Sequence, residues 1–169
     1  MPTYEFHHIL PLKRPQKAQL AQAVTDWHAV TFRAPRFVVN CRFISARDIP
    51  AEDSYIGGRV LNCNKLFVSL RSRIRRTPEQ YLSMTKTLQR MWDEAVQDSA
   101  HIGSGKELKD VFIMGTIDST LKRGWFLPMP GHFEKWVKEN TKGFQKQAET
   151  GDTFFEDLVQ EIGDRPEFQ

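Results

Sequence analysis

Cysteine is scarce in this chain of 169 residues, which contains only Cys41 and Cys63. Neither cysteine stands at a metal-ligand spacing from the five histidines, so the sequence predicts no zinc site. We interpret both as reduced, buried side chains of a cytoplasmic protein. A continuous apolar run of about 18 residues is also lacking, so we expect no membrane-spanning helix. The first residues show neither the basic nor the apolar region of a secretion signal, so we expect no export by that route.

A large excess of one charge sign is lacking as well. The chain has 24 basic and 21 acidic residues, and its formal net charge of +3 does not demand a nucleic-acid partner. Nucleic-acid binding through the arginines at positions 71, 73, 75 and 76 stays open as an alternative. The matching acidic total and the absence of glycine-aromatic interleaving argue against it, so we expect no such partner. The composition, 40% hydrophobic and 27% charged, is typical of one globular domain.

The residue pattern predicts two successive β-α-β units. In the first unit, alternation and helical spacing predict a strand at 3–10, a helix at 16–32 and a strand at 37–44. In the second unit they predict a strand at 66–70, a helix from 78 to about 95 and a strand at 110–115. Thr77 and Gln80 form a capping box where the second helix begins. Such units can place four strands in one sheet with both helices on one face. We therefore predict an α+β fold whose uncovered sheet face favours oligomerisation.

Pro2 is the first candidate functional residue. If Met1 is removed after synthesis, Pro2 becomes a free secondary amine at the start of a strand. An α-amino group titrates at about 7.7–8.0, and nearby positive charge favours its neutral, basic form. The arginines after the third strand could lower the pKa of this amine and also bind a substrate carboxylate. Met-Pro is nevertheless a common start and a basic run is usually a solvated surface, so these residues alone leave both interpretations open.

His28 is the second candidate. It lies on the apolar stripe of the first predicted helix, together with Val24 and Trp27. From this pattern alone, a hydrogen-bonded core histidine is favoured over a residue that binds a ligand.

The segment from Phe126 to His132, followed by Glu134 and Trp136, resembles the C-terminal region of the cis-chloroacrylate dehalogenase group of the tautomerase superfamily. The resemblance extends over about residues 2 to 138. The other matching segments are Pro2, Tyr4, Thr25-Asp26-x-His28, Tyr55-Ile56-Gly57-Gly58 and Phe67-Val68. The resemblance implies a β-α-β tautomerase fold, a homotrimer and catalysis by the free amino group of Pro2. It implies neither a metal nor an organic cofactor.

The resemblance also implies roles for individual residues. Counted without gaps from Phe67, the substrate-binding arginines of the family fall on Arg73 and Arg76, and His28 matches a histidine that contacts substrate. The glutamate that helps the dehalogenase activate water aligns with Lys122, and the tyrosine that assists it aligns with Phe112 across a one-residue gap. An ammonium cannot accept a proton from water, and phenylalanine has no hydroxyl. We therefore expect dehalogenase or hydratase activity to be absent or weak, while Phe112 and Lys122 stay in the predicted substrate-binding set.

The predicted function is that of a tautomerase, an isomerase that transfers a proton on a small 2-oxo or enol carboxylic acid. Pro2 would act as the base, Arg73 and Arg76 would hold the carboxylate, and His28 would orient the substrate. The alternative is a trimeric binding or interaction protein of the same fold with little catalysis. The two changed water-activating positions and the unmatched C-terminal tail favour that alternative.

We assign residues 1–140 to the tautomerase-like domain and residues 141–169 to a C-terminal extension. Apolar residues in the extension recur at close to helical spacing, at Phe154, Phe155, Leu158 and Ile162. They predict a short amphipathic helix that begins near Thr153. We expect this helix to pack on its own or a neighbouring subunit, so that truncation after Thr141 weakens assembly.

Overall fold

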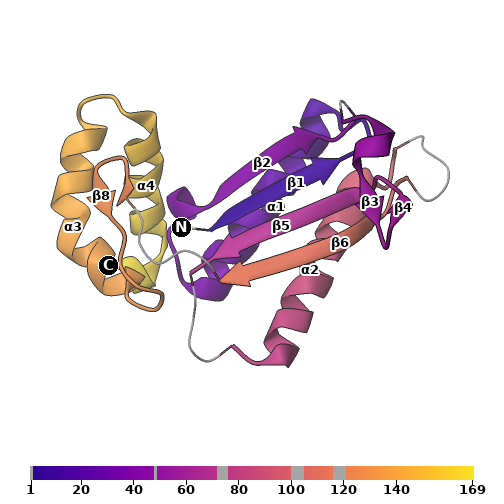
Figure 1. Cartoon of the computed structure of the whole chain (residues 1–169). Helices are drawn as coiled ribbons and strands as arrows, with labels where there is room; N and C mark the ends of the chain where they lie inside the picture. Colours follow the sequence, from indigo (N-terminus) through magenta and orange to yellow (C-terminus); the bar gives the residue numbers. More distant parts are fainter. Residues whose placement is uncertain (1, 48, 72–75, 100–104, 116–120) are drawn as a thin grey trace.

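The computed structural model describes residues 2–47, 49–71, 76–99, 105–115 and 121–169. At its centre lies a four-stranded sheet with the strand order β2-β1-β5-β6 (Figure 1). Its strands are β1 (Thr3–His8), β2 (Asn40–Ser45), β5 (Asn64–Leu70) and β6 (Leu108–Gly115). β1 is parallel to β2 and β5 is parallel to β6, whereas β1 and β5 are antiparallel. Short strands form two hairpins, β3 (Tyr55–Ile56) with β4 (Arg59–Val60) and β7 (Leu121–Lys122) with β8 (Trp125–Phe126).

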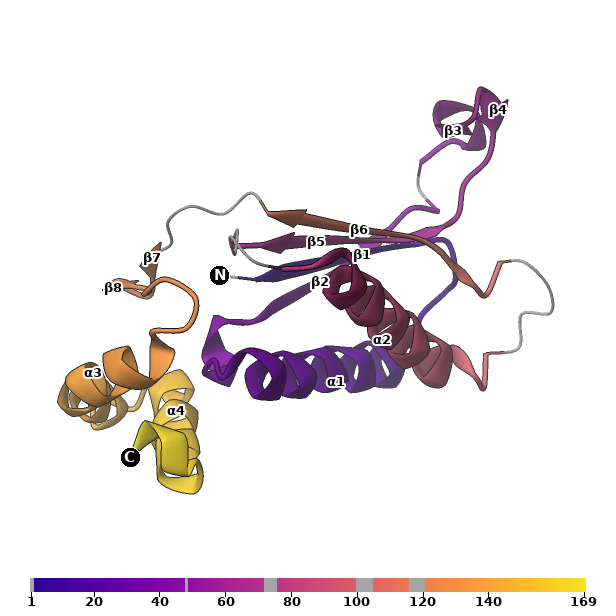
Figure 2. The ribbon, with the colours of Figure 1, turned by 90° about the horizontal axis from the view of Figure 1, so that it is seen from below.

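Two long helices connect the parallel strands and cover the same face of the sheet (Figure 2). They are α1 (Arg14–Phe32), between β1 and β2, and α2 (Pro78–Val96), between β5 and β6. The two predicted β-α-β units and the α+β fold are thereby confirmed. α1 begins two residues before the predicted start, because the Gln16 side chain accepts a hydrogen bond from the Lys13 backbone N–H at 2.9 Å and closes the first turn. None of the described helices is long and apolar enough to span a membrane.

The first hydrophobic core lies between the sheet and these helices. Every second residue of β1 and β5 is buried, as strand alternation requires when one face is covered. Tyr4, Phe6, Leu66 and Val68 thus meet the buried side chains of the helices, among them Leu20, Val24, Leu88 and Trp92. The alternation also fixes which side chains point away from the helices.

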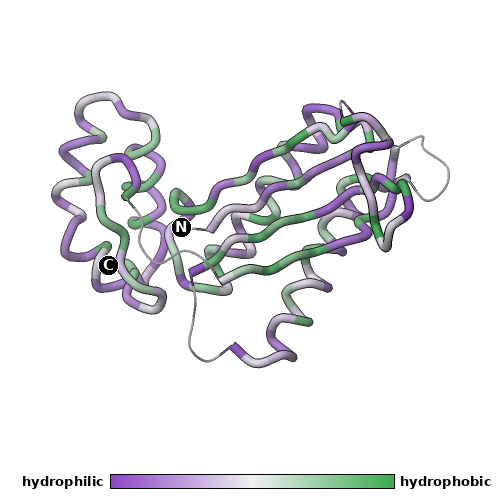
Figure 3. Tube along the Cα trace, in the orientation of Figure 1, coloured by the Kyte–Doolittle hydropathy of each residue, from purple (hydrophilic) through white to green (hydrophobic). Residues whose placement is uncertain are grey.

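The other face of the sheet is not covered by any described helix (Figure 2). Figure 3 shows that the trace of β5 and β6 is largely hydrophobic. On the uncovered face the ring of Phe67 stacks on that of Phe112 with centroids 5.0 Å apart, and His7 packs against Phe67 at the same distance. Phe112 is 45% exposed. A sheet face of this kind is suited to contact with another subunit.

A second hydrophobic core lies beside the ends of the strands. It is built by α3 (Phe133–Ala148), α4 (Thr153–Asp164) and the short 3-10 helices η1 (Arg36–Val38) and η3 (Pro166–Phe168). Phe37 and Val38 were predicted to open the second strand, but they lie in η1 and are buried in this second core. α4 begins where the extension was predicted to form a helix, and the side chain of Asp152 accepts a hydrogen bond from the Phe154 backbone N–H at 3.0 Å. The boundary drawn between residues 140 and 141 falls inside α3.

The C-terminal segment is fastened to the end of α1. The Arg165 guanidinium donates to the backbone carbonyls of Ala34 at 3.0 Å and Ala29 at 3.3 Å, and it pairs with Glu161 at 2.8 Å. The Glu161 carboxylate in turn accepts the backbone N–H of Arg36. Carbonyls at the end of a helix need partners from elsewhere in the chain, and Arg165 provides one.

Candidate active site

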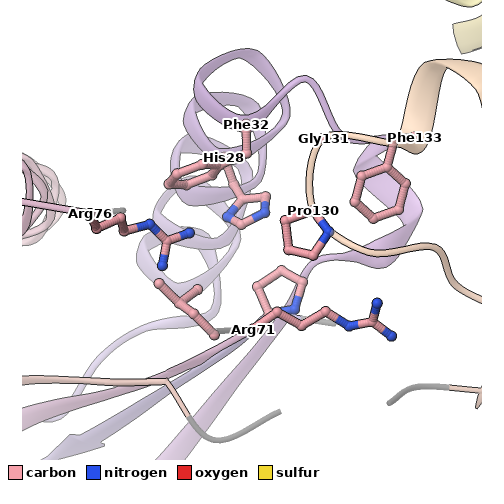
Figure 4. Close-up of a pocket in the computed structure, with 9 residues that line it drawn as sticks. His28, Phe32, Arg71, Arg76, Pro130, Gly131 and Phe133 are labelled. Atoms are coloured by element: carbon pink, nitrogen blue, oxygen red, sulfur yellow. The ribbon is translucent and has the colours of Figure 1, made fainter. Parts of the chain in front are cut away.

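A pocket lies between the start of β1, the second half of α1 and the segment before α3 (Figure 4). Its walls are mainly apolar, and its polar side chains are a histidine and two arginines. The lining residues are Pro2, His28, Phe32, Leu70, Arg71, Arg76, Pro130, Gly131 and Phe133. Concave sites with apolar walls and few polar groups are typical of small-molecule binding.

Pro2 stands directly before β1 and is buried. Its backbone carbonyl accepts two hydrogen bonds from Asn40 of β2, one from the backbone N–H and one from Nδ2, each at 3.1 Å. Pro2 is therefore held at a defined place in the pocket wall.

His28 reaches the pocket from the sheet-facing side of α1. Its Nδ1 lies 2.7 Å from the hydroxyl of Tyr4, and the imidazole is only 5% exposed. Burial, with the positive charge of Arg76 as a further cause, lowers the pKa of His28 to about 3. Burial raises the pKa of Tyr4, so its hydroxyl stays protonated and donates a hydrogen bond to Nδ1. A neutral imidazole that accepts at Nδ1 carries its hydrogen on Nε2, which makes His28 a hydrogen-bond donor at that atom.

Arg76 follows the third long strand and precedes α2. Its guanidinium lies over the ring of Phe32 at 5.1 Å and near that of Tyr81 at 6.0 Å. In Figure 4 it points toward the space beside His28. Contact with these two rings holds the Arg76 guanidinium at the pocket, and its N–H donors are suited to bind a carboxylate there.

Arg71 behaves differently from Arg76, although the sequence placed both in one cluster. It is buried, and its guanidinium donates to the backbone carbonyls of Leu127, at 3.2 Å, and Pro128. In Figure 4 the guanidinium points away from His28. Arg71 thus holds the segment that forms the opposite wall. No sequence pattern indicated this contact, because its partners are backbone atoms more than fifty positions away.

The structure brings three of the predicted site residues, Pro2, His28 and Arg76, to one pocket. Arg73 lies outside the described residues. Phe112 lies on the uncovered face of the sheet, since its neighbours Val111 and Ile113 pack on the first core. Lys122, in β7, donates from Nζ to Oδ1 of Asn40 at 3.1 Å, and neither Phe112 nor Lys122 lines the pocket.

Sequence reasoning missed the apolar walls, formed by Phe32 of α1 and by Pro130 and Phe133. In the sequence, the sign of this wall was the motif from Phe126 to His132, which contains Pro130 and Gly131. Among the described residues, no three His, Cys, Asp or Glu side chains gather as they would around a metal ion.

One family of known proteins matches most of this chain. A family model described as "Putative oxalocrotonate tautomerase enzyme" matches residues 1–141. A search of curated proteins finds no match to the chain. The family match covers both β-α-β units, all the pocket-lining residues and the first half of α3.

Several solved structures are similar to this one. A protein from the fungus Aspergillus fumigatus is 25% identical over 83% of this chain and 94% of its own, with a TM-score of 0.59. N1, a member of the cis-3-chloroacrylic acid dehalogenase family, is 19% identical over 86% of this chain and 96% of its own, with a TM-score of 0.56. Native RhCC from Rhodococcus jostii is 20% identical over 82% of this chain and 96% of its own, with a TM-score of 0.55. The last two likenesses show a shared fold.

Proposed function

Because this chain belongs to the oxalocrotonate tautomerase family, we propose that it is a tautomerase that uses the amino group of Pro2 as a general base. Its substrate would be a small 2-oxo or enol carboxylic acid. One observation carries the proposal: Pro2, His28 and Arg76 come from separate parts of the chain and line the same pocket.

The amine of Pro2 is suited to this task once Met1 has been removed. An α-amino group has an ordinary pKa of about 7.7–8.0. Burial and the nearby guanidinium of Arg76 both disfavour its protonated form, so the neutral amine is available near neutral pH. This amine accepts the proton of the enol hydroxyl, and the resulting ammonium returns a proton to the adjacent carbon as the carbonyl forms.

The other pocket residues have complementary tasks. Arg76, with Arg73 as a proposed second ligand, binds the substrate carboxylate. The Nε2 hydrogen of His28 donates to the oxygen that gains negative charge in the transition state. Phe32 and Phe133 offer an apolar wall, which favours a substrate whose remaining substituent is apolar.

We expect dehalogenase or hydratase activity to be absent or weak. The Nζ of Lys122 is hydrogen-bonded to Asn40, and Phe112 has no hydroxyl with which to activate water. These two changed positions also support the alternative of a binding protein with little catalysis. The experiment below distinguishes the tautomerase from the binding protein.

We further propose a homotrimer, the assembly that the family resemblance implies. The uncovered sheet face, on which Phe112 is 45% exposed and stacks on Phe67, offers a surface for contact between subunits. Cytoplasmic location and the lack of a nucleic-acid or membrane partner stay predictions.

The test compares wild type with Pro2→Ala in the ketonisation of phenylenolpyruvate, an enol acid with an apolar substituent. Intact mass on the same samples establishes whether Met1 has been removed. General base catalysis contributes typically 10²–10⁴-fold, so the variant should lose a factor in that range. If wild type without Met1 is no faster than the variant, the tautomerase proposal is wrong for this substrate class and the binding protein is favoured.

A further inference from the structure

Asn40 connects Pro2 to a side chain that does not line the pocket. Its backbone N–H and its Nδ2 both donate to the carbonyl of Pro2, each at 3.1 Å. Its Oδ1 accepts from Nζ of Lys122 at 3.1 Å. The amide of Asn40 therefore lies between the ammonium of Lys122 and the carbonyl of Pro2.

The surroundings of Lys122 keep its ammonium at this place. The side chain is partly buried, and Nζ lies 5.5 Å from the centre of the Phe154 ring, which belongs to α4. A partly buried ammonium needs hydrogen-bond acceptors or an aromatic face, and Asn40 and Phe154 supply one of each. Burial, followed by the charge of Arg123, lowers the pKa of Lys122.

The chemistry of the two groups decides how the amide is oriented. An ammonium has three donors and no acceptor, so Asn40 must turn its oxygen toward Lys122. The NH₂ end then faces two backbone carbonyls, and Nδ2 donates to that of Pro2 at 3.1 Å and to that of Val38 at 3.3 Å. Among the described residues, Lys122 is the side chain that donates to Oδ1, so without the ammonium this oxygen loses that hydrogen bond and the bonds of Nδ2 alone hold the amide at Pro2.

We propose that Lys122 is a positioning residue, which fixes the Asn40 amide and through it the place of Pro2 in the pocket. This inference rests on the proposed function, in which Pro2 is the base. It also assigns the β7–β8 hairpin and α4 a part in the activity, although neither lines the pocket. Lys122 touches neither substrate nor the reacting amine.

The experiment compares Lys122→Met with Lys122→Arg. The first removes the hydrogen-bond donor, and the second replaces it with another side chain that only donates. The matched control is Arg123→Met, because Arg123 also lies over the Phe154 ring, at 4.2 Å, yet is bonded to Asp152 and not to Asn40. For Lys122→Met we expect kcat to fall roughly tenfold with KM within about twofold, because small displacements of a reacting group slow the chemical step. The kcat of Lys122→Arg and that of Arg123→Met should stay within about threefold of the wild-type value, because neither change should displace Pro2.

Two further measurements test the path through Asn40. Asn40→Ala should cost at least as much in kcat as Lys122→Met, and the double variant should lose no more than Asn40→Ala alone, since both changes break one connection. Hydrogen exchange at the Asn40 backbone amide, which donates to Pro2, should become several-fold faster in Lys122→Met.

The outcomes separate this proposal from the proposed function. Unchanged kcat and unchanged exchange in Lys122→Met would overturn the positioning role, as would equal losses in Arg123→Met or additive losses in the double variant. If wild type shows no Pro2-dependent turnover, the tautomerase proposal fails, and the exchange rate of Asn40 alone then decides whether Lys122 fixes this amide.

Discussion

At the scale of single residues, the buried pair of Tyr4 and His28 sets what the pocket can offer a substrate. Burial keeps the imidazole neutral, and the 2.7 Å bond from the Tyr4 hydroxyl to Nδ1 leaves the ring hydrogen on Nε2. The position of His28 on an apolar helix stripe suggested a hydrogen-bonded core histidine, and the family resemblance suggested contact with substrate. In the structure one ring nitrogen is hydrogen-bonded in the core and the residue also lines the pocket, and contact with substrate stays a prediction.

The lowered pKa of His28 predicts a specific loss of stability in acid. Its pKa falls from an ordinary 6.5 to about 3, mainly through burial, so the unfolded state binds more protons than the folded state between these values. The free energy of unfolding should therefore decrease as pH falls through this window, by up to about 1.4 kcal/mol per pH unit from this residue. Urea unfolding at pH 7, 6, 5 and 4 measures the effect in wild type and in His28→Gln. The difference between the two should shrink as pH falls, and a constant difference would contradict the prediction.

At the scale of elements, the packing of α3 on the β7–β8 hairpin depends on Gly143. A Cβ atom at this position would lie 2.4 Å from Cη2 of Trp125. We predict that Gly143→Ala lowers the free energy of unfolding by about 1–3 kcal/mol, the usual cost of overpacking. The control is Gly163→Ala in α4, where a Cβ atom would meet nothing within 4 Å and the higher helix propensity of alanine should stabilise by about 0.5–1 kcal/mol. Equal effects of the two substitutions in urea unfolding would argue against a tight contact at Trp125.

The elements also show what a single sequence can predict. The strands and helices of the β-α-β units followed from alternation and helical spacing, because one face of each element is buried against the first core. Phe37 and Val38 are residue types that favour strands, but they lie in η1, where both are buried in the second core. The boundary after residue 140 marked the end of a resemblance, whereas α3 continues to Ala148. Pro2, His28 and Arg76 could be predicted from motifs, whereas the contacts of Arg71 with backbone carbonyls depend on the tertiary fold.

At the scale of the whole molecule, the C-terminal helices belong to the same folded body as the pocket. Arg165 binds the carbonyls of Ala29 and Ala34 at the end of α1, the helix that carries His28. α3 follows directly on Pro130 and Gly131, which form the opposite wall of the pocket. The extension thus supports the α1 side of the pocket through Arg165, while α3, which runs from the predicted domain into the extension, continues the opposite wall.

This arrangement refines the expected result of truncation after Thr141. The shortened chain would lose Phe144, Phe155 and Leu158, which are buried in the second core, and would expose Phe37 to water. We predict that the chain's own fold is weakened, with a Tm at least several degrees lower, because each large buried side chain contributes about 1.5–3 kcal/mol. Thermal unfolding at two protein concentrations distinguishes this loss from weaker assembly, since only dissociation makes the Tm depend on concentration. An unchanged Tm would show that the second core does not stabilise the fold, whereas a lower, concentration-dependent Tm would return the effect to the contacts between subunits.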